Sequence, residues 1–340
     1  MVNPVMVEAT RGRLPESHHR GRAAIVDSLG HIIRSWGDIQ APVFGRSSLK
    51  LIQAIPLIES GAADAFHLTP EEIALSCASH LGEEMHVHLL EGWLKKLGKD
   101  ERILECGIHR PLYMLSSKKV PSVYENPSVL HNQCSGKHLG ILTTVLHRNE
   151  HPEGYLLKEH PAQKRIEQVL SEMMSIDISH TPHGTDGCGI PAFAVPLYNI
   201  ALAMARLSDP SHLHYPRQKA IQRILAAVEA YPELIAGTDA FDTKVIKLTQ
   251  GHVICKGGAG GVQVGIIPSL GLGIALKIDD GNIKAAEIAF LAILRSLGCL
   301  DEDIYEKLEP RLSILTHKNK TVGFLQPTNF TTLLPETGTH

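Results

Sequence analysis

A serine and a lysine that could act together as nucleophile and base lie three residues apart in the run Arg46-Ser47-Ser48-Leu49-Lys50. Apolar residues continue a helical pattern after this run, and side chains at positions i and i+3 of a helix share one face. A neutral Lys50 could accept the proton of Ser47, whose oxygen would then attack an amide carbonyl. A helix cap by Ser47 with an exposed Lys50 would explain the same spacing. Ser48 is a rival nucleophile, but it lies only two residues before Lys50 and therefore points elsewhere.

A second lysine occurs in Lys256-Gly257-Gly258, after a short apolar run. Serine acyl-transfer enzymes of the penicillin-recognising type combine S-x-x-K with a further serine and with K-[ST]-G on a strand. Here Lys256 would lower the pKa of Lys50, and the glycines would let a substrate approach the strand closely. Either Ser76 or Ser79 could supply the further serine. Taken alone, the Lys-Gly-Gly run is better explained by a simple glycine-rich turn before Gly260-Gly261.

Two thiols and a carboxylate occur in glycine-bearing turns, at Cys134-Ser135-Gly136-Lys137-His138 and at Thr185-Asp186-Gly187-Cys188-Gly189. Two cysteines with another donor would suit zinc. The C-x-x-C pairs that are typical of zinc sites are missing, so buried inert cysteines are the better explanation of these residues taken alone.

The composition is that of an ordinary globular protein of 340 residues with a net charge of −3. No basic excess indicates nucleic-acid binding, and no apolar stretch approaches the roughly 20 residues that cross a bilayer. The six cysteines are widely spaced, which favours a reducing, cytoplasmic setting over a disulfide framework. We expect no membrane contact and no signal peptide.

Strand patterns occupy both ends of the chain, and helical patterns occupy the middle. The sequence therefore predicts an α+β fold in which strands from both termini form one antiparallel sheet, helices cover it, and a mainly helical region is inserted. We expect a single catalytic unit over 1–340, with strand-rich segments 1–45 and 245–325 in the sheet and 46–244 mainly helical. Expected strands are 5–10, 22–27, 31–36, 252–256, 262–267 and 272–278; expected helices are 69–80, 83–97, 136–146, 162–174, 194–207, 218–230 and 283–297.

Seven segments in this order resemble the asparaginase II family of the rhizobial inducible type, from about residue 5 to about 325. They are 7–12, 42–50, 56–66, 77–83, 131–138, 184–189 and 256–258. The resemblance implies hydrolysis of L-asparagine to L-aspartate and ammonia, a fold similar to serine β-lactamases and serine-dependent glutaminases, and a homodimer.

The resemblance also implies roles for particular residues. It pairs Ser47 with Lys50, and Ser79 rather than Ser76 with Lys256. Its zinc site falls on Cys134, Lys137 and Cys188, where zinc would assist substrate placement. Four residues are candidates for holding the amino-acid head group: Arg46, Glu83, His138 and Asp186. In the expected reaction Ser47 forms an acyl-enzyme, and backbone N–H groups hold the oxyanion.

Two other functions share parts of this pattern. A β-lactam or D-amino-peptide acyl-transfer enzyme also uses S-x-x-K with K-x-G, and penicillin acylation would identify it. A non-catalytic amino-acid binding protein could retain the fold, although such a protein has no need of two Ser-Lys pairs. Release of ammonia from asparagine decides between binding and hydrolysis.

Overall fold

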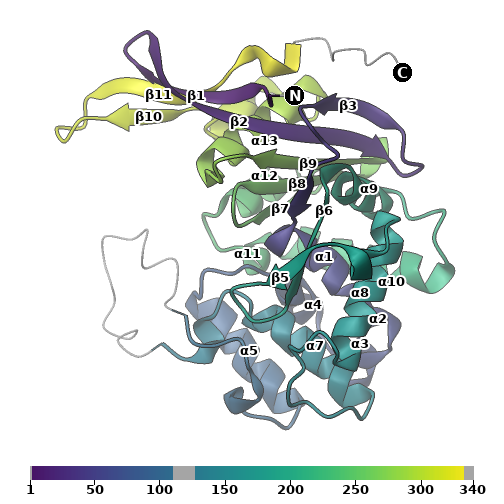
Figure 1. Ribbon diagram of the computed structural model, residues 1–340. Helices are drawn as coiled ribbons and strands as arrows, with labels where there is room; N and C mark the ends of the chain where they lie inside the picture. The colour runs from purple at the N-terminus through teal and green to yellow at the C-terminus, as the bar shows by residue number, and fades with distance from the viewer. Residues whose placement is uncertain (1, 110–126, 333–340) are drawn as a thin grey trace. The chain divides into compact units, whose positions relative to one another are not determined.

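The computed structural model describes residues 2–109 and 127–332, and it has the expected α+β architecture (Figure 1). Two compact units can be distinguished. The sheet unit comprises Met1–Ser48, Ala194–Asp209 and Leu248–His340, and the helical unit comprises Leu49–Phe193 and Pro210–Lys247. No helix within the described ranges is long and apolar enough to span a membrane.

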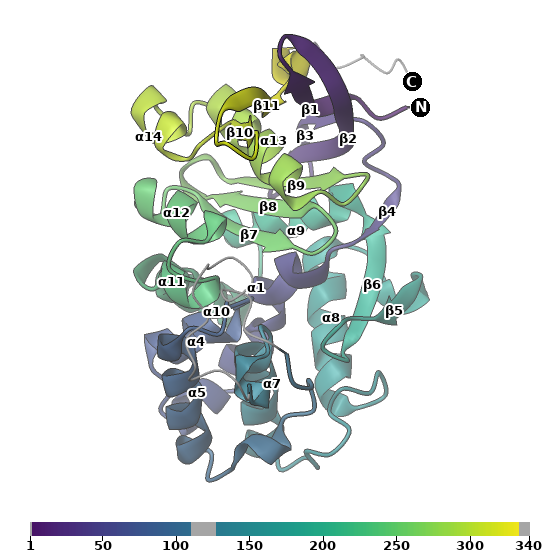
Figure 2. The same cartoon turned by 90° about the vertical axis from the view of Figure 1, so that its left-hand side faces the viewer.

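Strands from both ends of the chain form one antiparallel sheet in the sheet unit, which confirms the expected arrangement. The strand order is β10-β11-β1-β2-β9-β8-β7, and β3 also pairs with β2. Figure 2 shows β9, β8 and β7 side by side. The strands are β1 (Val5–Arg11), β2 (Leu14–Asp27), β3 (Ile32–Trp36), β7 (Ile254–Gly258), β8 (Val262–Ile267), β9 (Leu272–Ile278), β10 (Leu312–Leu315) and β11 (Thr321–Pro327).

Helices α9 (Leu197–Ser208) and α13 (Ile283–Ser296) cover opposite faces of this sheet. A Cβ atom on Gly265 would meet the ring of Phe290 on α13, whereas a Cβ atom on Gly273 would meet the backbone of Ala205 on α9. Gly265 pairs with Ile274, the residue next to Gly273, so the two glycines face opposite sides of the pleat. The central strands are therefore covered on both faces, which explains why they read as nearly continuous apolar runs.

Helix α9 begins three residues later than the expected helix 194–207. Residues 194–196 belong to β6 (Pro191–Pro196), since a residue that precedes proline favours extended backbone. The C-terminal half of β6 pairs with β4 (Pro42–Phe44), and its N-terminal half pairs with β5 (His183–Thr185). The sequence patterns did not indicate these three short strands.

The helical unit is built from short and medium helices around an apolar core. Thr69 and Glu72 form the predicted capping box at the start of α4, with the Thr69 N–H donating to Glu72 Oε2 over 2.8 Å. The helices are α1 (Lys50–Gln53), α2 (Ile55–Glu59), α3 (Ala62–Ala65), α4 (Pro70–Ser76), α5 (Glu84–Lys96), α7 (Ser135–His147), α8 (Pro161–Met174), α10 (Tyr215–Ala230), α11 (Pro232–Ile235) and α12 (Phe241–Leu248); α14 (Glu302–Lys307) belongs to the sheet unit.

Helices α4 and α7 meet at Gly136. A Cβ atom there would lie 2.2 Å from the carbonyl oxygen of Leu75, so only glycine allows the start of α7 to approach the end of α4 this closely. The contact brings two turns together within the helical unit: the turn after α4, which carries Ser79, and the turn before α7, which carries Cys134.

Candidate active site

The residues singled out from the sequence divide between the two units. Arg46, Ser47 and Lys256 belong to the sheet unit. The helical unit holds the other eight: Lys50, Ser79, Glu83, Cys134, Lys137, His138, Asp186 and Cys188.

Ser47 lies in a tight turn that opens a continuous helical run. The 3₁₀ helix η1 (Arg46–Leu49) leads directly into α1, so Ser47 and Lys50 are three residues apart along one run. Arg46 has a φ of +52°, a left-handed conformation that is unfavourable for a side-chain-bearing residue. The carbonyl of Gly45 accepts hydrogen bonds from the Ser48 N–H and from Ser48 Oγ, at 3.3 and 2.6 Å. Ser48 therefore holds the turn, and its hydroxyl is engaged within it.

Lys256 is buried on β7, opposite Val264 of β8, and its amine donates to the carbonyl of Gly257. Two residues further on, a Cβ atom at Gly258 would lie 2.8 Å from Gly45 O and 3.3 Å from Ser48 N. The absent side chain at Gly258 thus makes room for the turn that carries Ser47. The sequence had suggested a substrate, and not this turn, as the group for which the glycines make room.

Lys50 is buried, and its amine reaches three groups of the helical unit. Nζ donates to the carbonyl of Ala78, lies 2.9 Å from Ser79 Oγ, and lies 3.1 Å from Cys134 Sγ. Spacing along the sequence did not indicate that Lys50 contacts Ser79 or Cys134, because both partners come from distant turns.

Ser79, rather than Ser76, is the serine that faces this lysine. Helix α4 was expected to continue to about His80, but it ends at Ser76, and the chain turns at 77–82. The Ser76 hydroxyl donates to the carbonyl of Ile73 within its own helix. Ser79 is half-buried, and its backbone N–H donates to Ile235 O over 2.9 Å.

Cys134, Lys137 and Cys188 lie buried in one cluster of the helical unit. Lys137 Nζ lies 3.0 Å from Cys188 Sγ. A hydrogen bond with Cys188, together with the nearby Lys50 and Lys137, outweighs burial and lowers the pKa of Cys134 to about 4. The same hydrogen bond and burial raise the pKa of Cys188, so one thiolate is shared by the pair. Burial opposes the charge of Lys137, but the two sulfurs raise its pKa overall.

This donor set fits a zinc ion. Two sulfurs and one amine nitrogen are ligands that zinc accepts, and the lowered pKa of Cys134 favours the thiolate form that binds zinc. Within 2–109 and 127–332, no three His, Cys, Asp or Glu side chains are grouped closely enough to hold a metal ion. A metal at the cluster would therefore need Lys137 as a third protein ligand, and the lysine would have to release its proton on binding.

The candidate head-group residues have different surroundings. Both carboxylate oxygens of Glu83 accept from Thr238, at 3.1 Å from its N–H and at 2.6 Å from its hydroxyl. Asp186 is half-buried and accepts from the N–H of Gly187. His138 is fully buried; its Nδ1 lies 2.8 Å from Tyr155 Oη, and its Nε2 has no hydrogen-bond partner in the described part of the chain.

Asn132 supports the cluster and was not singled out from the sequence. Its amide nitrogen donates to the carbonyls of Cys106 and Gly107, each at 2.9 Å, and its Oδ1 accepts from the N–H of Cys134. An asparagine two residues before a functional position is a typical Asx-turn signal, and this signal could have identified it.

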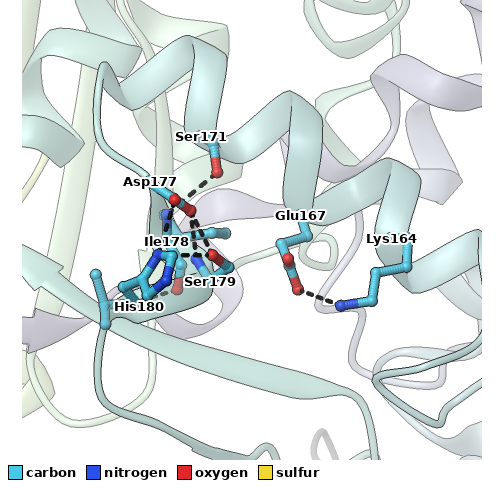
Figure 3. A network of polar contacts seen from close by, with 8 residues as sticks. Lys164, Glu167, Ser171, Asp177, Ile178, Ser179 and His180 are labelled. Carbon is cyan, nitrogen blue, oxygen red and sulfur yellow. Dashed lines mark hydrogen bonds and ion pairs between the residues drawn. The ribbon is translucent and has the colours of Figure 1, made fainter.

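A serine, a histidine and an aspartate also lie together near α8, where they form a helix cap and not a catalytic triad. Figure 3 shows Asp177, Ser179 and His180 at the 3₁₀ helix η5 (Ile178–His180). Asp177 Oδ2 and Ser179 Oγ both approach His180 Nδ1, at 2.8 and 3.1 Å. A triad needs its serine and its carboxylate on different ring nitrogens, so this histidine is not placed between them.

The model of a protein family described as L-asparaginase II matches residues 7–327. No protein of curated function matched the sequence. Among solved structures, the chain is similar to a β-lactamase from Mycobacterium bovis, with 12% identity and a TM-score of 0.43 over 81% of this chain and 94% of that one. It is also similar to Mglu in its native form, with 12% identity and a TM-score of 0.46 over 89% of this chain and 70% of that one. A third similar structure is the D-alanine carboxypeptidase AmpC from Burkholderia cenocepacia, with 15% identity and a TM-score of 0.40 over 82% of this chain and 93% of that one.

Proposed function

The chain belongs to the L-asparaginase II family, a family of hydrolases that act on amides, and from this premise we propose that it hydrolyses L-asparagine to L-aspartate and ammonia. The family match over residues 7–327 carries the proposal. The contact between Lys50 Nζ and Ser79 Oγ supports it, because a serine–lysine pair is a device for moving protons during acyl transfer.

Ser47 is the proposed nucleophile. Lys50, in its neutral form, accepts the Ser47 proton as the serine oxygen bonds to the side-chain amide carbon of asparagine. Backbone N–H groups hold the resulting oxyanion. When the C–N bond breaks, a proton delivered through Ser79 and the two lysines, Lys50 and Lys256, converts the leaving group to ammonia. Water then hydrolyses the β-aspartyl ester and frees Ser47.

Zinc is the proposed metal of Cys134, Lys137 and Cys188. Bound there, it would supply a positive charge that assists substrate placement. Because the thiol of Cys188 and the amine of Lys137 must lose their protons on binding, zinc affinity should fall as the pH falls. Lys137→Met should lower zinc content and the zinc-induced rise in melting temperature, whereas Cys299→Ser, outside the cluster, should change neither. A Lys137→Met protein that binds zinc as the parent does would remove this site from the proposal.

The head group of the substrate is assigned to Arg46, Glu83, His138 and Asp186. The unpartnered Nε2 of His138 supports a polar ligand nearby, because a buried imidazole nitrogen without a partner is costly. A homodimer is also part of the proposal, and light scattering on the purified protein tests it.

Trapping of the acyl-enzyme tests the core of the proposal. With hydroxylamine present, the parent protein should convert asparagine to β-aspartyl hydroxamate. Ser47→Ala should abolish both ammonia and hydroxamate formation, while Thr144→Val, which loses only a hydrogen bond within α7, should retain both. Full turnover by Ser47→Ala would refute the nucleophile. Parallel incubations with glutamine, β-aspartyl compounds and penicillin identify a different substrate, since stable penicilloylation of Ser47 would favour the β-lactam alternative.

A further inference from the structure

His80 is a fully buried residue of the helical unit that has no role in the scheme above. Its Nδ1 accepts from the backbone N–H of Gly82 over 3.1 Å. A backbone N–H can only donate, so Nδ1 carries no proton, and the ring is neutral with its hydrogen on Nε2. Nε2 lies 2.8 Å from Ser135 Oγ, which in turn donates to Leu130 O over 3.0 Å. The hydrogen bonds thus run in one direction from Gly82 through the ring to Leu130.

These bonds join two turns of the helical unit. The backbone N–H of His80 donates to Gln133 O over 3.1 Å, and the ring is bonded to Ser135. The turn that carries Ser79 is therefore hydrogen-bonded to both sequence neighbours of Cys134, Gln133 and Ser135. The same two turns supply the Lys50 partners described above: Ala78 O and Ser79 Oγ on one, and Cys134 Sγ on the other.

A neutral histidine suits this position because one side chain must both accept and donate. Asparagine can place an acceptor near Nδ1, and glutamine can place a donor near Nε2, but neither reaches both Gly82 and Ser135. The ring also stacks on His86, with centroids 4.9 Å apart, and His86 Nε2 is bonded to the carbonyl of Glu233. Hydrogen bonds therefore hold both ring nitrogens of His80, and the ring of His86 packs against one face.

We propose that His80 is a positioning residue: in its Nε2–H form it ties the Ser79 turn to the Cys134 turn and so keeps Ser79 Oγ in reach of Lys50 Nζ. The residue does not touch the reacting atoms. Its effect on turnover rests on the proposed function, whereas its hydrogen bonds and the placement of Ser79 do not.

Two measurements test the geometry without using activity. In protein labelled with ¹⁵N-histidine, the imidazole spectrum at pH 7 should show His80 as the Nε2–H tautomer, and Ser135→Ala should shift the Nε2 signal. A crystal structure of Ser135→Ala should show Ser79 Oγ displaced from Lys50 Nζ. An Nδ1–H or doubly protonated His80, or an unmoved Ser79, would overturn the proposal.

Kinetics with asparagine test the consequence. Ser135→Ala should lower kcat by about 10- to 100-fold, because small displacements of a catalytic group have effects of this size. KM should stay near the parent value. In a Ser79→Ala background the same substitution should have no further effect, since His80 would act only through Ser79. The matched control is Thr144→Val, which removes another buried hydroxyl of α7 and should leave kcat unchanged.

The outcomes separate the two proposals. A parent protein that is inactive on asparagine refutes the proposed function, while the spectrum and the crystal structure still decide the role of His80. An active parent whose Ser135→Ala and His80→Gln variants match Thr144→Val refutes the positioning role alone. If the loss of kcat in the double variant Ser79→Ala/Ser135→Ala equals the combined losses of the two single variants, the positioning role is refuted as well. Such a result would show that Ser135→Ala acts on kcat without involving Ser79.

Discussion

Replacing Gly258 by alanine should move the proposed nucleophile, and the structure sets the size of the effect. The new Cβ atom would lie 2.8 Å from Gly45 O, whereas ordinary van der Waals contacts begin near 3.4 Å. Strand and turn must therefore separate by about 0.6 Å. Because Ser48 bonds to this same carbonyl through its N–H and its hydroxyl, the displaced carbonyl takes the whole Gly45–Ser48 turn with it. Ser47 lies inside that turn.

Two quantities should change in Gly258→Ala. Overpacking of this kind costs about 1–3 kcal/mol of folding free energy, measurable by urea denaturation. Since a 1 Å misplacement can cost about 10²-fold in rate, a displacement of 0.6 Å should lower kcat for asparagine by about tenfold. The acylation step should carry the loss, so hydroxamate formation should fall by the same factor.

Gly265→Ala is the matched control. Its Cβ atom would lie 2.7 and 2.8 Å from two ring atoms of Phe290, a clash of the same size in the same sheet, but directed at α13. It should destabilise the protein to a similar extent and leave kcat near the parent value. Equal losses of kcat in both variants would mean that general destabilisation lowers the activity. A folded Gly258→Ala protein with parental kcat would refute the steric reasoning outright.

Three further predictions concern single features of the helical unit. Thr69→Ala removes the capping box of α4 and should cost about 0.5–2 kcal/mol in urea denaturation, with kcat unaltered; a kcat loss in the folded variant would contradict this. Ser76→Ala should keep activity while Ser79→Ala loses it, because only Ser79 meets Lys50; the reverse order in an ammonia-release assay would exchange their roles. Burial lowers the pKa of both His80 and His86 below that of an unfolded histidine, so only the unfolded chain gains these protons just below pH 6.5. The free energy of unfolding should then fall as the pH drops below 6.5, by no more than about 1.4 kcal/mol per pH unit for each residue, and a flat profile between pH 7 and 5.5 would contradict it.

Local signals in the sequence predicted many of the elements, although strands β10 and β11 and the first eight residues of β2 were not among them. Period-two patterns and turn residues at both ends indicated the antiparallel sheet, and the Thr69 capping signal indicated the start of α4. These predictions succeed because a cap or a turn is decided by residues within one or two turns of the chain. The strands β4, β5 and β6 were not predicted, since each is three to six residues long and depends on a partner far away in sequence.

The surroundings of Lys50 illustrate what spacing cannot reveal. The i, i+3 rule indicated Ser47 as its partner, and that pairing stays a prediction. The contacts with Ser79 and Cys134 depend on how α4 and α7 approach each other at Gly136, which is a matter of packing. Neither a hydrophobic period nor a capping signal in the sequence contains information about which two helices pack against each other. The positions of the cysteines were visible in the sequence, but the shift in the pKa of Cys134 requires knowing that two amines and a second thiol surround it.

Gly258 has a neighbour in the folded chain that the sequence did not indicate. The sequence indicated that a glycine after Lys256 permits a close approach, and it suggested the substrate as the approaching group. The structure places the backbone of Gly45 and Ser48 beside Gly258, and that contact exists without any ligand. The requirement for glycine is therefore set by the folded chain itself, before a substrate arrives. It follows that Gly258→Ala should impair every substrate that Ser47 attacks by a similar factor, whereas a glycine that only made room for asparagine would show a loss that depends on the substrate.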